Sequence, residues 1–90
     1  MSYVKVKLIP PLDKEVGSKE INVSMKENTT VFDILNKLSL EYKVRLVIDN
    51  DLNPGYLVLL NDKDINVLEG LKTKVKNGDI LVIIPVSHGG

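Results

Sequence analysis

The chain has 90 residues, of which 43% are hydrophobic and 27% charged, and its 12 basic side chains balance its 12 acidic ones. This length predicts one domain with one modest core, and the composition is typical of a globular protein. The zero net charge argues against a field that would attract nucleic acid or an anionic membrane. The lack of cysteine excludes disulfides, thiolate catalysis and zinc–sulfur sites.

The single histidine, His88, argues against a metal site built from several histidines. No apolar stretch approaches the length needed to span a membrane. The first ten residues alternate lysine with apolar residues instead of forming the continuous apolar block of a signal peptide. We therefore expect a cytoplasmic protein that directly contacts neither a membrane nor nucleic acid.

Two strands paired as a hairpin are expected near the N-terminus. Residues 3–8 and residues 20–25 both alternate apolar with more polar side chains, which is the period of a strand with one buried face. Between them, the stretch "PPLDKEVGSKE" predicts a loop. Pro10 and Pro11 close the first strand there, and Gly17 lies in a turn.

A helix is expected next, because the apolar period changes at residues 31–42 to that of one helical face. Thr30 is a natural N-cap residue, and Asp33 follows three positions later, close to the capping-box pattern and near the positive end of the helix dipole. Leu40 lies opposite the apolar stripe, and we expect it to pack under the loop that follows. The stripe consists of Val31, Ile34, Leu35, Leu38 and Tyr42.

The second half of the chain predicts further strands and turns. Residues 45–48 indicate a short strand or an irregular packed segment, residues 50–55 a turn, and residues 56–60 a strand. Residues 72–76 indicate an edge strand or an extended loop, and Asn77-Gly78 predicts a tight turn. The apolar run at residues 80–84 predicts a strand that is buried on both faces and central in its sheet.

These elements predict an α+β fold, in which a sheet of four or five strands carries one helix across one face. We expect the domain to comprise residues 1–85. Pro85 ends the last strand because proline cannot donate a backbone hydrogen bond to a neighbouring strand. Residues 86–90 are then expected to form a flexible C-terminal tail with little to bury.

Few internal residues are suited to chemistry. The chain has no glycine-rich phosphate loop, and its one histidine offers no catalytic Ser-His-Asp arrangement. Residues 49–51 and 61–64 carry carboxylates that could bind a hard cation, but they lack the ligand number and glycine placement of an EF-hand, which favours solvated turns. Three alternating lysines form either a basic ridge that contacts an acidic partner or the solvent-exposed face of an edge strand; they are Lys72, Lys74 and Lys76.

The last two residues, Gly89 and Gly90, allow two interpretations. They are either a solvated end or a reactive terminus. Glycine has no Cβ, so a diglycine can enter a narrow slot in a partner and leave the terminal carboxylate unhindered. That carboxylate is anionic at neutral pH and a poor electrophile. Because this chain has no nucleotide site of its own, a partner protein would have to activate it.

The sequence resembles the ubiquitin-like β-grasp family of sulfur carriers and protein modifiers. The resemblance covers nearly the whole chain and is carried by "TVFDILNKL", "LLND", "LEGL", "NGD" before an apolar strand, and the diglycine end. The ending "SHGG" is similar to the ubiquitin-related modifier branch, although Ser87 replaces its leucine. The layout "NGDILVIIPVSHGG" is similar to small archaeal modifier proteins and the small subunit of molybdopterin synthase, although only one proline, Pro85, is present.

The resemblance implies a β-grasp fold with a mixed sheet, and a carrier protein rather than an enzyme. It implies that a ubiquitin-activating-type enzyme adenylylates Gly90 with ATP-Mg, and that a sulfur donor protein then converts the terminus to a thiocarboxylate. The sulfur would serve tRNA thiolation, or the terminus would form an isopeptide bond with a lysine of a target protein. Gly89, His88, Ser87 and Val86 would contact the activating enzyme, and the chain itself would bind no cofactor and no metal.

Two alternatives remain open at this point. The protein could be a molybdopterin synthase small subunit that donates sulfur during molybdenum cofactor synthesis. It could instead belong to another class, a non-catalytic β-grasp module that docks to a partner through its sheet or an apolar patch and has an inert tail. Deletion of the diglycine distinguishes this last class from the two reactive ones.

Overall fold

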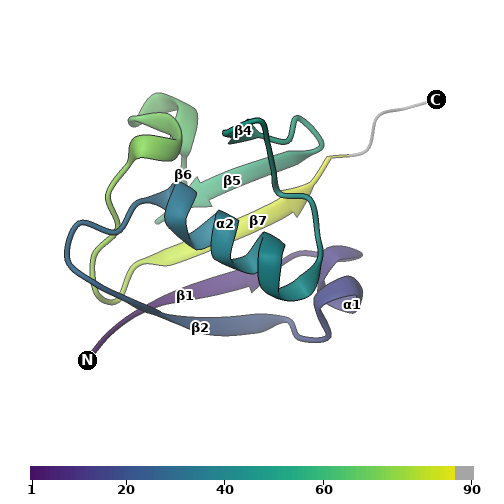
Figure 1. The fold of residues 1–90 in the computed structure, drawn as a ribbon, viewed down its shortest axis with the longest axis horizontal. Coiled ribbons are helices and arrows are strands. Elements are labelled where there is room, and N and C mark those ends of the chain that lie inside the picture. The colour runs from purple at the N-terminus through teal and green to yellow at the C-terminus, as the bar shows by residue number, and fades with distance from the viewer. Residues whose placement is uncertain (87–90) are drawn as a thin grey trace.

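Five strands form one mixed sheet in the computed structural model of the chain, which describes residues 1–86 (Figure 1). The strand order is β2-β1-β7-β5-β6. β1 pairs in parallel with β7, whereas the other three neighbouring pairs are antiparallel. The strands are β1 (Ser2–Leu8), β2 (Glu20–Met25), β5 (Tyr56–Leu60), β6 (Lys63–Asp64) and β7 (Ile80–Pro85). This arrangement confirms the predicted α+β class and the mixed β-grasp sheet.

The segment between β1 and β2 is not only a loop, as the sequence predicted. It contains a short helix, α1 (Leu12–Val16), which ends where Gly17 adopts a φ of 90° and its N–H donates to the Asp13 carbonyl at 2.8 Å. Leu12 is 1% exposed and belongs to the core. A helix of five residues is too short to show a helical period in sequence.

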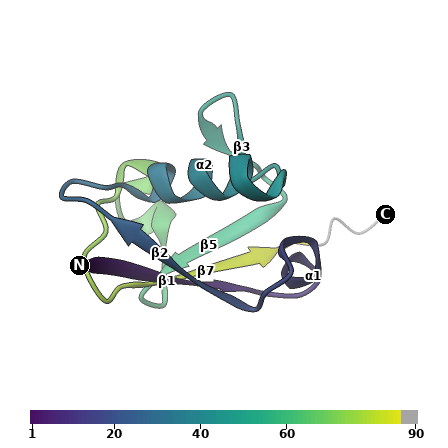
Figure 2. The same ribbon diagram turned by 60° about the horizontal axis from the view of Figure 1, so that its bottom comes forward.

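Helix α2 (Val31–Tyr42) lies across one face of the sheet, as predicted (Figure 2). The hydroxyl of Thr30 accepts from the Asp33 N–H at 3.2 Å, and the Asp33 carboxylate accepts from the Thr30 N–H at 2.9 Å. This reciprocal capping box confirms the predicted start of the helix. The prediction for Leu40 was wrong: it is 75% exposed, because no part of residues 1–86 covers that side of the helix.

After α2, a small hairpin stands outside the main sheet. Its strands are β3 (Val47–Ile48) and β4 (Asp51–Leu52), joined through Asp49 and Asn50, which both have positive φ. This turn geometry matches the twist of short hairpins. Of residues 45–48, only Val47 and Ile48 form the short strand, which Figure 2 shows beside α2, whereas residues 45–46 form an irregular segment in which Leu46 is buried. Asp51 and Leu52, which were predicted as part of a turn, form β4 instead.

Two single-turn 3₁₀ helices, η1 (Ile65–Val67) and η2 (Gly70–Lys72), follow β6. Residues 73–76 are then extended, but they form only an isolated bridge between Thr30 and Lys74 rather than an edge strand. Thr73 and Val75 are buried, whereas Lys72, Lys74 and Lys76 are exposed, so the predicted alternation is confirmed. The predicted turn at Asn77-Gly78 is present and leads into β7.

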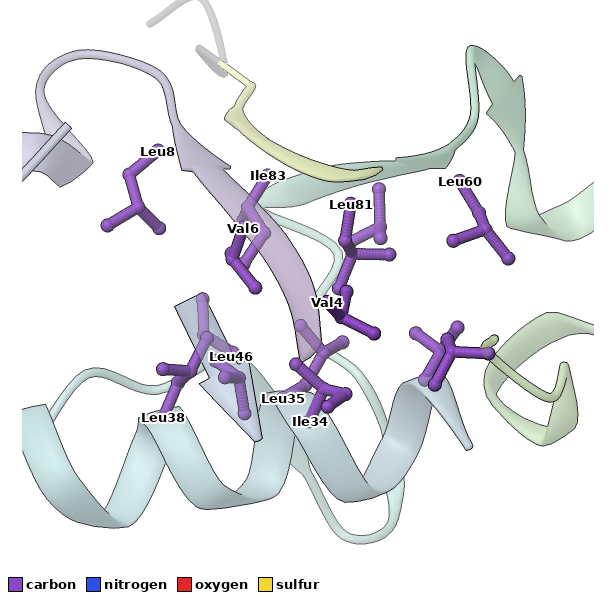
Figure 3. Close-up of a cluster of buried hydrophobic side chains, with 14 of the residues drawn as sticks. Val4, Val6, Leu8, Ile34, Leu35, Leu38, Leu46, Leu60, Leu81 and Ile83 are labelled. Atoms are coloured by element: carbon purple, nitrogen blue, oxygen red, sulfur yellow. The ribbon is translucent and has the colours of Figure 1, made fainter. Parts of the chain in front are cut away.

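The core lies between the sheet and α2 (Figure 3). Leu81 and Ile83 of β7 are fully buried in it, and β7 is the middle strand, as predicted. The prediction that β7 is buried on both faces was wrong, because Val82 and Ile84 are only partly buried. The buried side chains labelled in Figure 3 are Val4, Val6, Leu8, Ile34, Leu35, Leu38, Leu46, Leu60, Leu81 and Ile83.

None of the helices within residues 1–86 has both the length and the apolar character needed to cross a bilayer.

Candidate functional site

The end of β7 is the place where the chain leaves the sheet (Figure 1). Pro85 is the last residue of the strand and lies opposite Tyr56, which is the first residue of β5. The next N–H, that of Val86, donates to the carbonyl oxygen of Gly55 at 2.8 Å. The Val86 side chain is 45% exposed. The backbone is thus held until Val86, while the Val86 side chain is accessible to a partner.

Of the predicted site residues, the structure places Val86 alone. Gly90, the predicted point of covalent attachment, and Gly89, His88 and Ser87, the predicted partner contacts, lie outside the described residues. The structure therefore defines the base from which these four residues extend.

Asn53 and Gly55 form the base beneath Val86. The Gly55 N–H donates to Oδ1 of Asn53 at 2.9 Å, and Nδ2 of Asn53 donates to the Arg45 carbonyl at 2.6 Å. The Asn53 N–H donates to the carbonyl of Leu46, which is itself buried in the core. The turn that accepts the Val86 hydrogen bond is therefore tied to the segment that follows α2.

A patch of apolar side chains lies on the face of the sheet opposite α2, and we call it the open-face patch. It consists of Leu57 and Leu59 of β5 and of Val82 and Ile84 of β7. Leu57 lies opposite Ile84 and Leu59 opposite Val82, and all four are only partly buried. Alternation along the strands places them on the face away from the core. Ile84 is two residues from Val86, so the patch adjoins the exit of the chain.

Lysines of β1 lie beside this patch. Lys7 is next to Val82 in the parallel pairing of β1 with β7, and Lys5 is next to Ile80. Lys5 lies 4.0 Å from the Glu20 carboxylate, but both side chains are about half exposed, so this ion pair contributes little stability. The open face thus combines apolar contact area with positive charge, which suits a partner with apolar and acidic side chains.

Sequence reasoning considered docking through the sheet but did not identify the residues of the open-face patch. The runs "YLVLL" and "ILVII" are apolar on both faces, and we interpreted the second as a doubly buried strand. The signal that could have revealed the patch was the number of helices. One predicted helix covers only one face of a sheet, so the apolar side chains on the other face needed a different partner.

The other candidate sites have structural roles. Asp64 Oδ1 accepts from the Asn66 N–H at 2.8 Å and caps η1, while Asp49 lies in the turn between β3 and β4. No group of three or more histidine, aspartate or glutamate side chains within residues 1–86 is placed to share a metal ion. The ridge of Lys72, Lys74 and Lys76 precedes the start of β7, whereas Val86 follows the end of that strand.

A groove of about 550 Å³ lies on the helix side of the molecule, between the start of α2, the β3–β4 hairpin and η1–η2. Phe32, Leu52 and Leu71 are among its lining residues. Gly55, Pro85 and Val86 are not, so the groove is separate from the exit of the chain.

Tyr56, the first residue of β5, has a raised pKa. Burial of its ring raises the pKa of the Tyr56 hydroxyl above its usual value of 10.0, and the negative charge of Glu15 on α1 raises this pKa further. A phenol with the usual pKa is already neutral at physiological pH, so the raised pKa of Tyr56 changes its charge only in the alkaline range.

Comparison with known proteins identifies the family. The sequence pattern of the ThiS family matches residues 6–90, which include the open-face patch, the exit at Val86 and the diglycine. The chain belongs to the ThiS family. This match confirms the resemblance inferred from the sequence. The relatives of this ThiS family protein include ubiquitin-like modifiers and sulfur carriers.

Two related sequences and one related structure show how similar these proteins are. Small archaeal modifier protein 3 of Haloferax volcanii is 33% identical over 78 residues, which are 83% of this chain and 85% of that protein. A ubiquitin-related modifier 1 homolog of Dictyostelium discoideum is 31% identical over 94 residues, covering 97% of this chain and 98% of that protein. The solution structure of small archaeal modifier protein 1 from Methanosarcina acetivorans aligns with a TM-score of 0.83 and 32% identity, covering 100% and 98% of the two chains.

Proposed function

We propose that this ThiS family protein is a modifier and sulfur carrier whose reacting group is the carboxylate of Gly90. The observation that supports it is the position of the open-face patch beside the exit at Val86. Four residues separate Val86 from the end of the sequence, and four residues span at most about 14 Å. A partner that docks on the patch is therefore within reach of Gly90.

The chemistry follows from the weak electrophilicity of a carboxylate. A ubiquitin-activating-type partner uses ATP-Mg to form an acyl-adenylate, in which a Gly90 carboxylate oxygen bonds to the α-phosphorus and pyrophosphate leaves. A hydrosulfide ion supplied by a donor protein then attacks the acyl carbon and AMP leaves, which yields the thiocarboxylate without a change of oxidation state. On a tRNA-thiolating enzyme, the thiocarboxylate sulfur then replaces a carbonyl oxygen of a uridine, and the Gly90 terminus is released as a carboxylate. The activated carbon is alternatively attacked by a lysine amine of a target protein, which forms an isopeptide bond.

In this scheme the chain supplies recognition and the partner supplies catalysis. Leu57, Leu59, Val82 and Ile84 give the partner an apolar contact area, and Lys5 and Lys7 add positive charge at its border. Gly89, His88, Ser87 and Val86 contact the channel that leads to the nucleotide. No side chain of this protein needs to transfer a proton.

An intact-mass measurement tests the proposal. The protein is incubated with its activating enzyme, ATP-Mg and a sulfur donor, and we expect its mass to increase by one oxygen-to-sulfur exchange. A variant that lacks Gly90 should fold normally and remain unchanged in mass. An unchanged mass of the full-length protein, with an enzyme shown to be competent on another carrier, would refute the carrier function.

Conjugation is tested separately in cell lysates. Species of higher mass that contain this protein, and that disappear in the variant lacking Gly90, would establish the modifier function. Their absence, together with a positive mass shift, would restrict the protein to sulfur transfer.

A further inference from the structure

Asn53 uses all of its backbone and side-chain polar groups at the exit of the chain. Its N–H donates to the Leu46 carbonyl at 2.9 Å, and its carbonyl accepts from the Tyr56 N–H at 3.0 Å. Its Nδ2 donates to the Arg45 carbonyl at 2.6 Å, and its Oδ1 accepts from the Gly55 N–H at 2.9 Å. This single residue therefore joins the segment after α2 to the start of β5.

These hydrogen bonds fix one peptide group in particular. The peptide between Gly55 and Tyr56 has its N–H bound to the Asn53 carbonyl and its C=O bound to the Val86 N–H at 2.8 Å. Because a peptide group is planar, holding one side of it also sets the direction of the other. The direction of the Val86 N–H therefore depends on the turn that Asn53 closes.

From this geometry we propose that Asn53 is a positioning residue for activation of the C-terminus, an inference that rests on the proposed function. Asn53 holds Gly55, Gly55 holds Val86, and Val86 sets where residues 87–90 enter the partner. Asn53 itself contacts neither the nucleotide nor the reacting carboxylate. Its loss should lower the rate of adenylylation while leaving docking intact, because the open-face patch does not include it.

The chain offers a matched control at the other end of the same strand pair. Asn61 follows β5 and also makes two side-chain hydrogen bonds: its Nδ2 donates to Asp79 Oδ1 at 3.0 Å, and its Oδ1 accepts from the Ile80 N–H at 3.0 Å. Both asparagines thus secure an end of the pair of β5 with β7. Only Asn53 lies at the end from which Val86 leaves.

The test compares Asn53→Ala with Asn61→Ala in ATP–pyrophosphate exchange with the activating enzyme. We expect Asn53→Ala to lower kcat about 10- to 100-fold with KM within about twofold, since small misplacements of a reacting group have effects of this size. Asn61→Ala should leave kcat and KM unchanged, even if its melting temperature falls as much as that of Asn53→Ala. Asn53→Ser should recover part of kcat, because a serine hydroxyl can close the same kind of turn more weakly.

A second measurement does not depend on activity. Hydrogen exchange at the Val86 amide should accelerate in Asn53→Ala and stay slow in Asn61→Ala, both compared under conditions in which they are folded. Equal kcat values for the two alanine variants, or unchanged Val86 exchange in Asn53→Ala, would overturn the inference. Failure of the unaltered protein to support exchange with a competent enzyme would overturn the proposed function instead.

Discussion

Leu59 and Val82 lie opposite each other on adjacent strands and both point away from the core, whereas their neighbours Leu60 and Leu81 are buried beneath α2. The sheet therefore has one face packed by the helix and one face whose apolar side chains are partly exposed. Partly exposed apolar patches of this kind mark interaction sites on soluble domains. In this protein the patch adjoins the exit of the chain, so under the proposed function one surface would serve both docking and delivery of the C-terminus.

A charged side chain in the open-face patch should weaken docking. Leu59→Glu places a carboxylate where we expect an apolar contact, and burying it against a partner costs free energy. We predict that KM for this protein in ATP–pyrophosphate exchange rises about tenfold or more, equivalent to about 1.4 kcal/mol or more of lost binding, with a smaller change in kcat. Asn53→Ala is expected to do the reverse, because it should lower kcat and leave KM nearly unchanged.

Leu40→Glu is the matched control for this substitution. Leu40 is also an apolar residue on the surface, 75% exposed, but it lies on α2 and not on the sheet. Its replacement should leave KM unchanged. A similar rise in KM for Leu40→Glu and Leu59→Glu would show that the open-face patch is not the docking surface.

Sequence periodicity predicted most of this fold because its main elements each bury one regular face. The stripe on α2 and the alternation in β1 and β2 appear in the structure as expected. Periodicity failed for α1, whose five residues make little more than one turn, and for the outward side of β7. Val82 and Ile84 are apolar although they face away from the core, so a rule that equates apolar runs with burial assigned them to the interior.

The exit site was predictable only in part, for a different reason. The reactive role proposed for its terminus came from the diglycine together with the family resemblance, and residues 87–90 lie outside the described part of the chain. Its base is built from residues distant in sequence: Asn53 and Gly55 have the composition of an ordinary turn, and nothing in "NDLNPG" indicates that Val86 will bind there. Such a contact depends on the pairing of β5 with β7 and becomes visible only in three dimensions.

For two leucines, the burial of the side chain is the opposite of what the sequence predicted. Leu12 lies in a predicted loop but is 1% exposed, whereas Leu40 lies in a predicted helix but is 75% exposed. We predict that Leu12→Ala lowers the free energy of unfolding by about 2–5 kcal/mol, because it leaves a cavity in the core. Leu40→Ala should change it by no more than about 0.5 kcal/mol. Urea unfolding followed by circular dichroism measures both, and equal losses would contradict the assigned burial.

The capping box at the start of α2 should contribute measurably to stability. Thr30→Ala removes the acceptor for the Asp33 N–H, and we expect a loss of about 1 kcal/mol in the free energy of unfolding. Asp33→Ala removes the acceptor for the Thr30 N–H and should have a similar effect. Because the two groups form one motif, the double variant should lose less than the sum of the single losses. Strict additivity in urea unfolding would show that the two hydrogen bonds act independently.

The raised pKa of Tyr56 predicts a specific loss of stability at alkaline pH. Burial of the ring and then the charge of Glu15 make the folded protein hold the phenolic proton more tightly than the unfolded chain, whose pKa is about 10. Stability from this difference is fully present below about pH 10 and is lost as the pH rises through the folded-state pKa, because the folded state then binds more protons than the unfolded state. Tyr56→Phe removes the titrating group and keeps the ring, while lysine deprotonation affects both proteins alike. We therefore expect the free energy of unfolding to fall more steeply in the unaltered protein than in Tyr56→Phe between about pH 9 and 11.

Parallel profiles in urea unfolding would show that the Tyr56 proton is not held more tightly in the folded state.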